Sequence, residues 1–283
     1  RDFDVTIFEA NDHIGGILRY GIPEFRLPKS ILDRLMDQLL KSGVKIRPNT
    51  AIGTTLTVDD LLRDGYQAIF LGTGVWRPYR LNKKGESLGH VHYAIEYLRN
   101  PSVYRLGKSV AVIGAGNVAM DVARTAFRHG AKEVYIVARR GEEHVAARDI
   151  ELQFAKIDGA KLLDYKDVVE FVDEGVVLID TSLKQDPNGK FKVEAIAGTE
   201  SLLEADSVIV AIGQGPRAVI VSSTKGINVT ESGLVAVDES GRTSRPGIFA
   251  SGDVVTGAKT VVEAVRLSKK VAAAIEDYID GIH

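Results

Sequence analysis

The middle of the chain carries its apolar residues in an order that predicts strand, helix and strand. An apolar run at 110–113 predicts the first strand, 118–128 the helix, and a second apolar run at 134–137 the second strand. The connection between the first strand and the helix, residues 114–119, reads Gly-Ala-Gly-Asn-Val-Ala. This succession is typical of a β–α–β unit that binds a dinucleotide. The alternative is an ordinary strand–helix turn.

The residues of this connection have separate tasks in such a unit. Gly114 allows a tight turn, Gly116 lets the backbone approach a pyrophosphate, and Ala119 lets the helix pack closely against the strand. The pyrophosphate would then lie on the free N–H groups at the positive end of the helix, next to Asn117 and Val118.

The position after the second strand decides which dinucleotide fits. NAD sites usually have Asp or Glu there, about twenty residues after the glycines, to hold the ribose 2′-hydroxyl. This chain has Ala138 at that position, and Arg139 and Arg140 follow it. Guanidinium groups suit a 2′-phosphate, so the sequence predicts an NADP site. The alternative is that both are ordinary surface arginines.

The beginning of the chain resembles the same second strand. Residues 4–9 read Asp-Val-Thr-Ile-Phe-Glu, and residues 133–138 read Glu-Val-Tyr-Ile-Val-Ala. The first copy ends in Glu9, an acidic residue that can accept a hydrogen bond from a ribose hydroxyl. By this comparison, about twenty residues that form a strand, a glycine turn and a helix are expected before Arg1. We therefore expect two dinucleotide sites, the first of them incomplete in this chain.

Further helices and strands are expected on both sides of the central unit. Helices are expected at 31–41 with Ser30 as the cap, at 57–62 and at 260–279. Gly213 ends a strand in the way that residues 72–74 end another. The expected strands are 44–46, 68–71, 162–172, 176–183, 191–196, 207–212 and 247–253, with a turn at 186–189 and a crossover between units at 99–102.

Composition narrows the class of protein. The chain has 283 residues, of which 45% are hydrophobic and 26% charged, and its formal net charge is −2. This profile predicts a soluble cytoplasmic protein without a nucleic-acid or membrane partner. There is no cysteine, which excludes disulfides and thiolate metal sites within these residues. The six scattered histidines offer no set of metal ligands and no nucleophile motif is present, so we expect cofactors rather than side chains to carry the chemistry.

Three segments together resemble a known family. Residues 15–28, Gly-Gly-Ile-Leu-Arg-Tyr-Gly-Ile-Pro-Glu-Phe-Arg-Leu-Pro, look like the signature of the glutamate synthase small-subunit family. Residues 114–123 with 137–140 are similar to its NADPH segment, and 243–257 to its second flavin-binding segment. The pattern is shared with NADPH-dependent subunits of electron-bifurcating ferredoxin reductases and with the N-terminal half of dihydropyrimidine dehydrogenase.

The resemblance implies an α/β fold with two nested, doubly wound (Rossmann-like) nucleotide-binding domains. Residues 1–103 would form the first part of an FAD-binding domain without its first strand and glycine turn. Residues 104–216 would form the NADP-binding domain, and 217–283 the second part of the FAD domain. Family members carry a complete glycine motif before the position of Glu9, and many carry a cysteine-rich iron–sulfur domain before that, so we expect a chain truncated at its N-terminus.

The resemblance also assigns site residues. Glu9 would bind the adenosine ribose of FAD, and Gly15, Gly16 and Arg19 would line the flavin side. Thr73 and Gly74 would close over the cofactor, and Gly252 and Asp253 would hold the ribityl chain and pyrophosphate. The helix that begins near Thr260 would direct its N-terminus at the flavin ring. Gly213 is expected among the cofactor-binding residues as well.

The implied function is an oxidoreductase module in which NADPH passes a hydride to FAD. No protein acid or base is needed for that step, and the electrons would leave through iron–sulfur centres of another domain or a large subunit. One alternative is the NADPH-binding subunit of a bifurcating ferredoxin–NADP oxidoreductase. The other is a non-catalytic module that only binds NADP(H) or acts as a subunit scaffold. In either case we expect this chain to lack tightly bound FAD, and the flavin-side sheet to be rearranged or its open edge to pair with another chain, as in a homo-oligomer.

Overall fold

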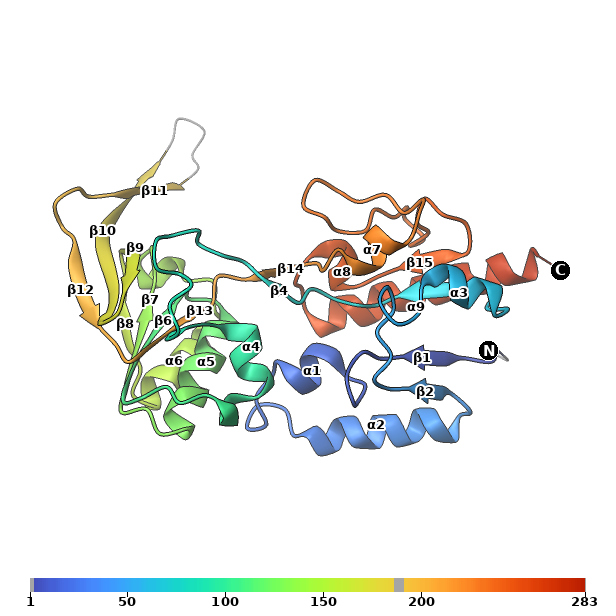
Figure 1. Cartoon of the computed structure of the whole chain (residues 1–283), viewed down its shortest axis with the longest axis horizontal. Helices are drawn as coiled ribbons and strands as arrows, with labels where there is room; N and C mark the ends of the chain where they lie inside the picture. Colours follow the sequence, from blue (N-terminus) through green and yellow to red (C-terminus); the bar gives the residue numbers. More distant parts are fainter. Residues whose placement is uncertain (1–2, 186–190, 283) are drawn as a thin grey trace. The chain divides into compact units, whose positions relative to one another are not determined.

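The computed structural model describes residues 3–185 and 191–282, and the chain in it forms two compact units (Figure 1). The first unit comprises the chain up to Arg19, Glu24–Arg77 and the chain from Gln214 onwards. The second comprises Tyr20–Pro23 and Pro78–Gly213. The chain passes between them at β4 (Arg77–Pro78) and β14 (Gln214–Gly215). The turn expected at 186–189 lies outside the described residues.

The second unit is built on a continuous parallel sheet. Its five strands have the order β5-β13-β6-β7-β8. The central strand, β6, pairs with β13 on one side and β7 on the other, so that Ile113 lies opposite both Val210 and Val137. The strands are β5 (Val91–Tyr93), β13 (Ser207–Val210), β6 (Ser109–Ile113), β7 (Glu133–Val137) and β8 (Lys161–Leu163).

Helices connect and cover these strands. α5 (Asn117–Arg128) joins β6 to β7, and its buried face includes Ala119, Val122 and Ala126. Together with α4 (Ala94–Arg99) and α6 (Asp149–Ile157) it packs on the sheet around one apolar cluster, in which Val110, Val112 and Ile136 are fully buried. Short 3-10 helices occur at Pro101–Val103 and Glu142–His144.

A second sheet in this unit is antiparallel. β10 (Gly175–Gln185) pairs with β9 (Lys166–Val172), β11 (Phe191–Ala195) and β12 (Ser201–Glu204). The single strand expected at 162–172 is divided into β8 and β9, because Tyr165 between them has a φ of 51°, which no strand residue adopts.

The first unit contains two separate pairs of parallel strands. β1 (Thr6–Phe8) pairs with β2 (Lys45–Arg47), and β3 (Ile69–Leu71) pairs with β15 (Ile248–Ala250). Within the described residues no strand joins the two pairs. The helices of this unit are α1 (Gly16–Tyr20), of which Tyr20 is assigned to the second unit, α2 (Lys29–Lys41), α3 (Val58–Arg63), α7 (Val219–Ser223), α8 (Asp253–Thr256) and α9 (Val261–Asp280). None of the described helices is long and apolar enough to cross a membrane.

Two further expectations are wrong. Ser30 does not cap α2, because the helix begins at Lys29 directly after Pro28, and the Glu24 carboxylate accepts a hydrogen bond from the Lys29 N–H instead. The crossover expected at 99–102 does not exist, because Arg99 ends α4 inside the second unit. That unit begins at Pro78 rather than near 104, since β5 pairs with β13 and thereby belongs to its sheet.

Candidate functional site

The glycine connection after β6 leaves an open helix N-terminus. Gly114 has a φ of 119°, and a side chain on it would lie 2.4 Å from the carbonyl oxygen of Ala211. A side chain on Gly116 would meet nothing within 4 Å. Gly116 is the N-cap of α5, with no side-chain cap and no acidic residue in the first turn. The first N–H groups of α5 are therefore available to an anion.

The loop that precedes α6 holds this glycine connection in place through two hydrogen bonds. The Ala147 N–H donates to the carbonyl of Ala115 at 3.0 Å, and the Arg148 N–H donates to Asn117 Oδ1 at 3.0 Å. Asn117 is therefore bonded to the protein itself through its side-chain oxygen. Sequence reasoning missed Ala147 and Arg148, which have no local motif. Val118 is half-buried and Ala119 is fully buried, as close packing of α5 on the sheet requires.

The residues after β7 present two cations. Ala138 is buried and its backbone continues the pairing with β8, donating to the Leu163 carbonyl and accepting from Lys166 N–H. Arg139 and Arg140 are exposed, and among the described residues neither guanidinium makes a hydrogen bond or an ion pair. No carboxylate stands where an NAD site would have one. The arrangement can hold a pyrophosphate at α5 and a further phosphate at the arginines.

Gly213 lies in the same unit, three residues beyond β13. It has a φ of 106°, and its carbonyl accepts a hydrogen bond from Tyr79 N–H at 3.1 Å. Its place among the cofactor-binding residues stays a prediction.

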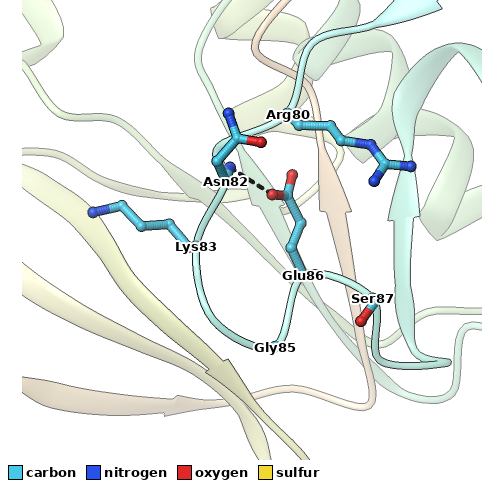
Figure 2. A pocket seen from close by; sticks show the side chains of 6 residues that line it. All are labelled: Arg80, Asn82, Lys83, Gly85, Glu86 and Ser87. Carbon is cyan, nitrogen blue, oxygen red and sulfur yellow. Dashed lines mark hydrogen bonds between the residues drawn. The ribbon is translucent and has the colours of Figure 1, made fainter.

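A pocket of about 230 Å³ lies on the loop that leads to β5, but it contains no predicted site residue. Figure 2 shows Arg80, Asn82, Lys83 and Glu86 around it. The carboxylate of Glu86 accepts hydrogen bonds from the N–H groups of Leu81 and Asn82, which ties the loop together. The pocket therefore looks like a consequence of loop folding.

In the first unit, Glu9 lies directly after β1. One carboxylate oxygen, Oε1, accepts hydrogen bonds from both the backbone N–H and the side-chain amide of Asn11, at 2.8 and 2.7 Å. The backbone of Glu9 bonds with Arg47 and Thr50. The carboxylate is thus oriented at the carboxyl end of β1, where a ribose-binding acid would stand.

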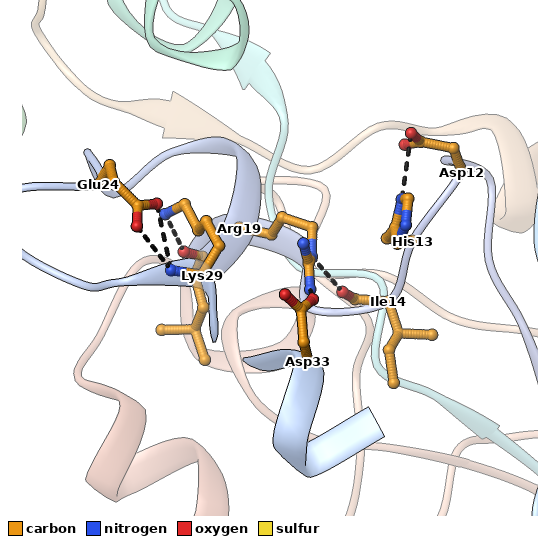
Figure 3. Close-up of polar contacts among 8 residues, drawn as sticks. Asp12, His13, Ile14, Arg19, Glu24, Lys29 and Asp33 are labelled. Carbon is orange, nitrogen blue, oxygen red and sulfur yellow. Dashed lines mark hydrogen bonds and ion pairs between the residues drawn. The ribbon is translucent and has the colours of Figure 1, made fainter. Parts of the chain in front are cut away.

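The segment around Gly15 and Gly16 begins α1 and is held from α2. Figure 3 shows Arg19 between the Ile14 carbonyl, to which its Nε donates at 3.1 Å, and the Asp33 carboxylate. Lys29 Nζ donates to the carbonyl of Leu18 at 2.9 Å. Arg19 therefore holds this segment to α2, and its contact with a flavin stays a prediction.

Trp76 was missed by sequence reasoning, although it is the only tryptophan. Its indole N–H donates to the carbonyl of Thr73 at 3.1 Å, and its ring lies within 4 Å of where side chains on Gly16 and Gly74 would be. It thereby brings together three of the predicted residues. A single aromatic residue near a glycine run is the signal that could have indicated it.

The carboxyl ends of β3 and β15 place two predicted segments side by side. Because the strands are parallel neighbours, Thr73 and Gly74 follow one and Gly252 and Asp253 follow the other. Gly252 has a φ of 75°, and a side chain on it would touch Ala264 of α9 at 3.6 Å. Ligands of open α/β sheets bind at this end of the strands.

Asp253 and Thr260 lie at two helix starts. Burial raises the pKa of Asp253, and the nearby Glu263 adds to this, although the Lys259 N–H donates to Asp253 at 3.1 Å. Thr260 caps α9 together with Glu263, whose carboxylate accepts from Thr260. These bonds lower the pKa of Glu263. The carboxylate of Glu263 thus already occupies the start of α9. This negative charge weakens the attraction that the helix N-terminus is expected to have for reduced flavin.

The fold and the glycine connection define a dinucleotide-binding α/β oxidoreductase. The model of the pyridine nucleotide-disulphide oxidoreductase family matches residues 6–267, and the chain belongs to this family. The fold prediction is thereby confirmed, and the predicted cofactors, NADPH and FAD, are those of the family. Within the described residues no group of three or more side chains could hold a metal ion.

Similar proteins support the resemblance to glutamate synthase. The glutamate synthase (NADPH) small chain of Escherichia coli is 31% identical over 97% of this chain and 63% of its own length. The β subunit of the NADP(+)-dependent formate dehydrogenase of Moorella thermoacetica is 38% identical over 99% of this chain and 41% of its own length. The chain therefore spans about two fifths to three fifths of these relatives.

Solved structures show the same fold. Mycobacterium tuberculosis FprA in complex with NADPH has a TM-score of 0.81 at 19% identity, covering 99% of this chain and 78% of FprA. The thioredoxin reductase of T. acidophilum has a TM-score of 0.69 at 22% identity, covering 100% of this chain and 92% of its own.

Proposed function

We propose that this chain is the module of an NADPH-dependent flavin oxidoreductase that receives reducing equivalents from NADPH, as in the small subunit of glutamate synthase. The observation that carries the proposal is the pairing of an uncapped α5 N-terminus at Gly116 with two unengaged guanidinium groups at Arg139 and Arg140. The first binds a pyrophosphate, and the second distinguishes a 2′-phosphate from a hydroxyl.

The residues of the first unit fit part of an FAD molecule. Glu9 at the end of β1, Gly74 after β3 and Gly252 after β15 lie at strand ends where such a cofactor binds. Within the described residues no strand and glycine turn pair with the free edge of β1, so these residues account for only part of an FAD site. Bound FAD would supply the hydride acceptor, and the protein would orient it and exclude water.

The partners of the module are part of the proposal. The two curated relatives above are longer than this chain, and electrons would leave through an iron–sulfur domain or a large subunit of the whole protein. A second candidate is a module that serves an NADP-linked formate dehydrogenase or a bifurcating ferredoxin–NADP oxidoreductase. It is favoured by the higher identity, 38% against 31%, to the formate dehydrogenase subunit.

The nucleotide preference is the direct test. Titration of the chain with NADPH and NADH should show tighter binding of NADPH. In an Arg139→Ala, Arg140→Ala double variant the affinity for NADPH should fall by about 1.5–3 kcal/mol, which is roughly tenfold to 150-fold, while that for NADH stays unchanged. Arg105→Ala is the control, because Arg105 is exposed before the opposite, amino end of β6. Equal affinity of the original chain for both nucleotides would refute the proposal.

A further inference from the structure

The segment that contains the two arginines also contains two acids. We call residues 138–141 the basic loop; Glu142 and Glu143 follow it directly. Carboxylates so close in sequence can pair with guanidinium groups and compete with a phosphate for them. Among the described residues neither pairs with Arg139 or Arg140.

Both carboxylates are engaged by other partners. Glu142 forms an ion pair with Lys156 of α6 at 2.6 Å. Glu143 Oε1 accepts a hydrogen bond from the Tyr165 hydroxyl at 2.8 Å. A hydrogen bond from its own backbone and this bond from Tyr165 lower the pKa of Glu143, so that its charged form is favoured.

Tyr165 is itself fixed by the neighbouring strands. Its φ of 51° is unusual for a residue with a side chain and is maintained by its surroundings. The N–H of Thr181 in β10 donates to the Tyr165 carbonyl at 2.8 Å. The buried hydroxyl of the same Thr181 donates to the carbonyl of Arg139 at 3.1 Å. One residue of β10 thus connects the turn that carries Tyr165 with the basic loop.

The bonded pair of Glu143 and Tyr165 lies directly against the backbone of the basic loop. A side chain on Gly141 would lie 2.4 Å from Glu143 Oε1 and 2.6 Å from the Tyr165 hydroxyl oxygen. Only a glycine leaves the space that the pair occupies. The glycine, the acid and the tyrosine therefore lie next to one another, with the Glu143 side chain exposed to solvent.

We propose that Tyr165 is a positioning residue of the NADP site: by holding Glu143 against Gly141 it keeps this carboxylate from Arg139 and Arg140 and leaves both guanidinium groups to a 2′-phosphate. The inference rests on the function proposed above and adds a determinant of its specificity. When Tyr165 cannot donate, Glu143 turns to the arginines and competes with the phosphate. Affinity for NADP(H) then falls, whereas NAD(H), which has no 2′-phosphate, binds as before.

The experiment measures the ratio of NADPH to NADH affinity by titration. Tyr165→Phe should lower this ratio roughly threefold to tenfold, the net effect of one ordinary hydrogen bond. In the double variant Tyr165→Phe, Glu143→Gln the competing charge is gone, and the ratio should return to within about twofold of the original. Tyr135→Phe is the matched control, because the Tyr135 hydroxyl donates to Glu133 at 3.1 Å within β7 and not to Glu143.

Each result decides the matter. If the original chain prefers NADPH and Tyr165→Phe leaves the ratio unchanged, the inference is overturned and the proposed function stands. A lowered ratio that the double variant does not restore also overturns it, because the loss then comes from a disturbed loop and not from the carboxylate. Should Tyr165→Phe fail to fold, Glu143→Gln alone should keep or raise the ratio, and a decrease would overturn the inference. No preference in the original chain overturns both proposals.

Discussion

One strand in each unit, β1 and β7, comes from a similar stretch of sequence, but the two strands lie in very different sheets. Residues 4–9 and 133–138 share one pattern and both contain a strand, β1 and β7. β7 pairs with β6 and β8 in a sheet of five strands, and three of its five residues are buried. β1 pairs only with β2 among the described strands, and none of its three residues is buried.

The difference shows what a central strand contributes. β6 offers both of its edges for hydrogen bonding and ends in the glycine connection that leads to α5. In the first unit β1 and β3 each have an edge without a described partner, and Phe70 of β3 is 42% exposed. A strand between them would join the pairs β1–β2 and β3–β15 into one sheet and carry a second phosphate site. The two units should therefore differ in how firmly they hold a nucleotide.

The largest expected difference concerns flavin. A polypeptide of these 283 residues should bind NADPH but retain no stoichiometric FAD after purification, because no described strand supplies the pyrophosphate turn beside β1. The measurement is flavin absorbance relative to protein, with an NADPH titration of the same sample as the control. Full flavin occupancy would show that the first unit forms a complete site by other means.

The next prediction separates the two glycines of the complete unit. Gly114→Ala should lower the free energy of unfolding by about 3 kcal/mol or more, because its backbone conformation is left-handed and the new atom overlaps the Ala211 carbonyl. Gly116→Val should leave the thermal midpoint near the original, since the space there is open, and should weaken NADPH binding at least roughly 100-fold.

Thermal melts and NADPH titrations of both variants check this pair. Each variant serves as the control for the other, because Gly114 is expected to be required by the fold and Gly116 by the ligand. A stable Gly114→Ala chain, or NADPH binding retained by Gly116→Val, would show that the roles are assigned wrongly.

The smallest effects concern two aspartates with opposite pKa shifts. Burial raises the pKa of Asp253, so its folded state holds the proton more tightly than the unfolded state. Its contribution favours folding below the unfolded pKa of about 4 and is lost as the pH rises through the folded pKa. Asp253→Asn keeps an acceptor for the Lys259 N–H and should raise the thermal midpoint at pH 7.

Asp206 in the second unit gives the opposite sign. The N–H groups of Ser109 and Lys108 lower its pKa, so its contribution is present above the unfolded pKa and is lost as the pH falls through the folded pKa. Asp206→Asn should therefore lower the thermal midpoint at pH 7. Both differences should diminish towards low pH, and a shift of the same sign in both variants would contradict this account.

Much of the local structure follows from the sequence alone. The apolar run at 110–113, the glycines and the helix after them gave the correct β6–α5–β7 unit, because strand, turn and helix preferences act over a few residues. The same holds for the start of α9 at Thr260, where a capping threonine precedes the helix. The prediction that Ala138 and the two arginines mark the ribose side of the site used only their distance from the glycines.

The predictions were wrong where a residue outside the local segment determines the structure. Ser30 has the chemistry of a cap, but Glu24 supplies the hydrogen bonds at the start of α2. The second unit begins at Pro78 because β5 pairs with β13, more than a hundred residues later in the chain. No local preference encodes such a pairing, since its free energy comes from hydrogen bonds and burial that exist only in the assembled sheet.

The site divides in the same way. The sequence by itself determined which residues are predicted to meet a dinucleotide: the glycines, Ala119 and the two arginines. Only the tertiary structure decided that Ala147 fastens the glycine connection, that Trp76 joins Gly16 to Gly74, and that Tyr165 restrains Glu143. The physical reason is that a hydrogen bond or a packed glycine requires two segments at a fixed distance, and the folded sheets alone fix that distance.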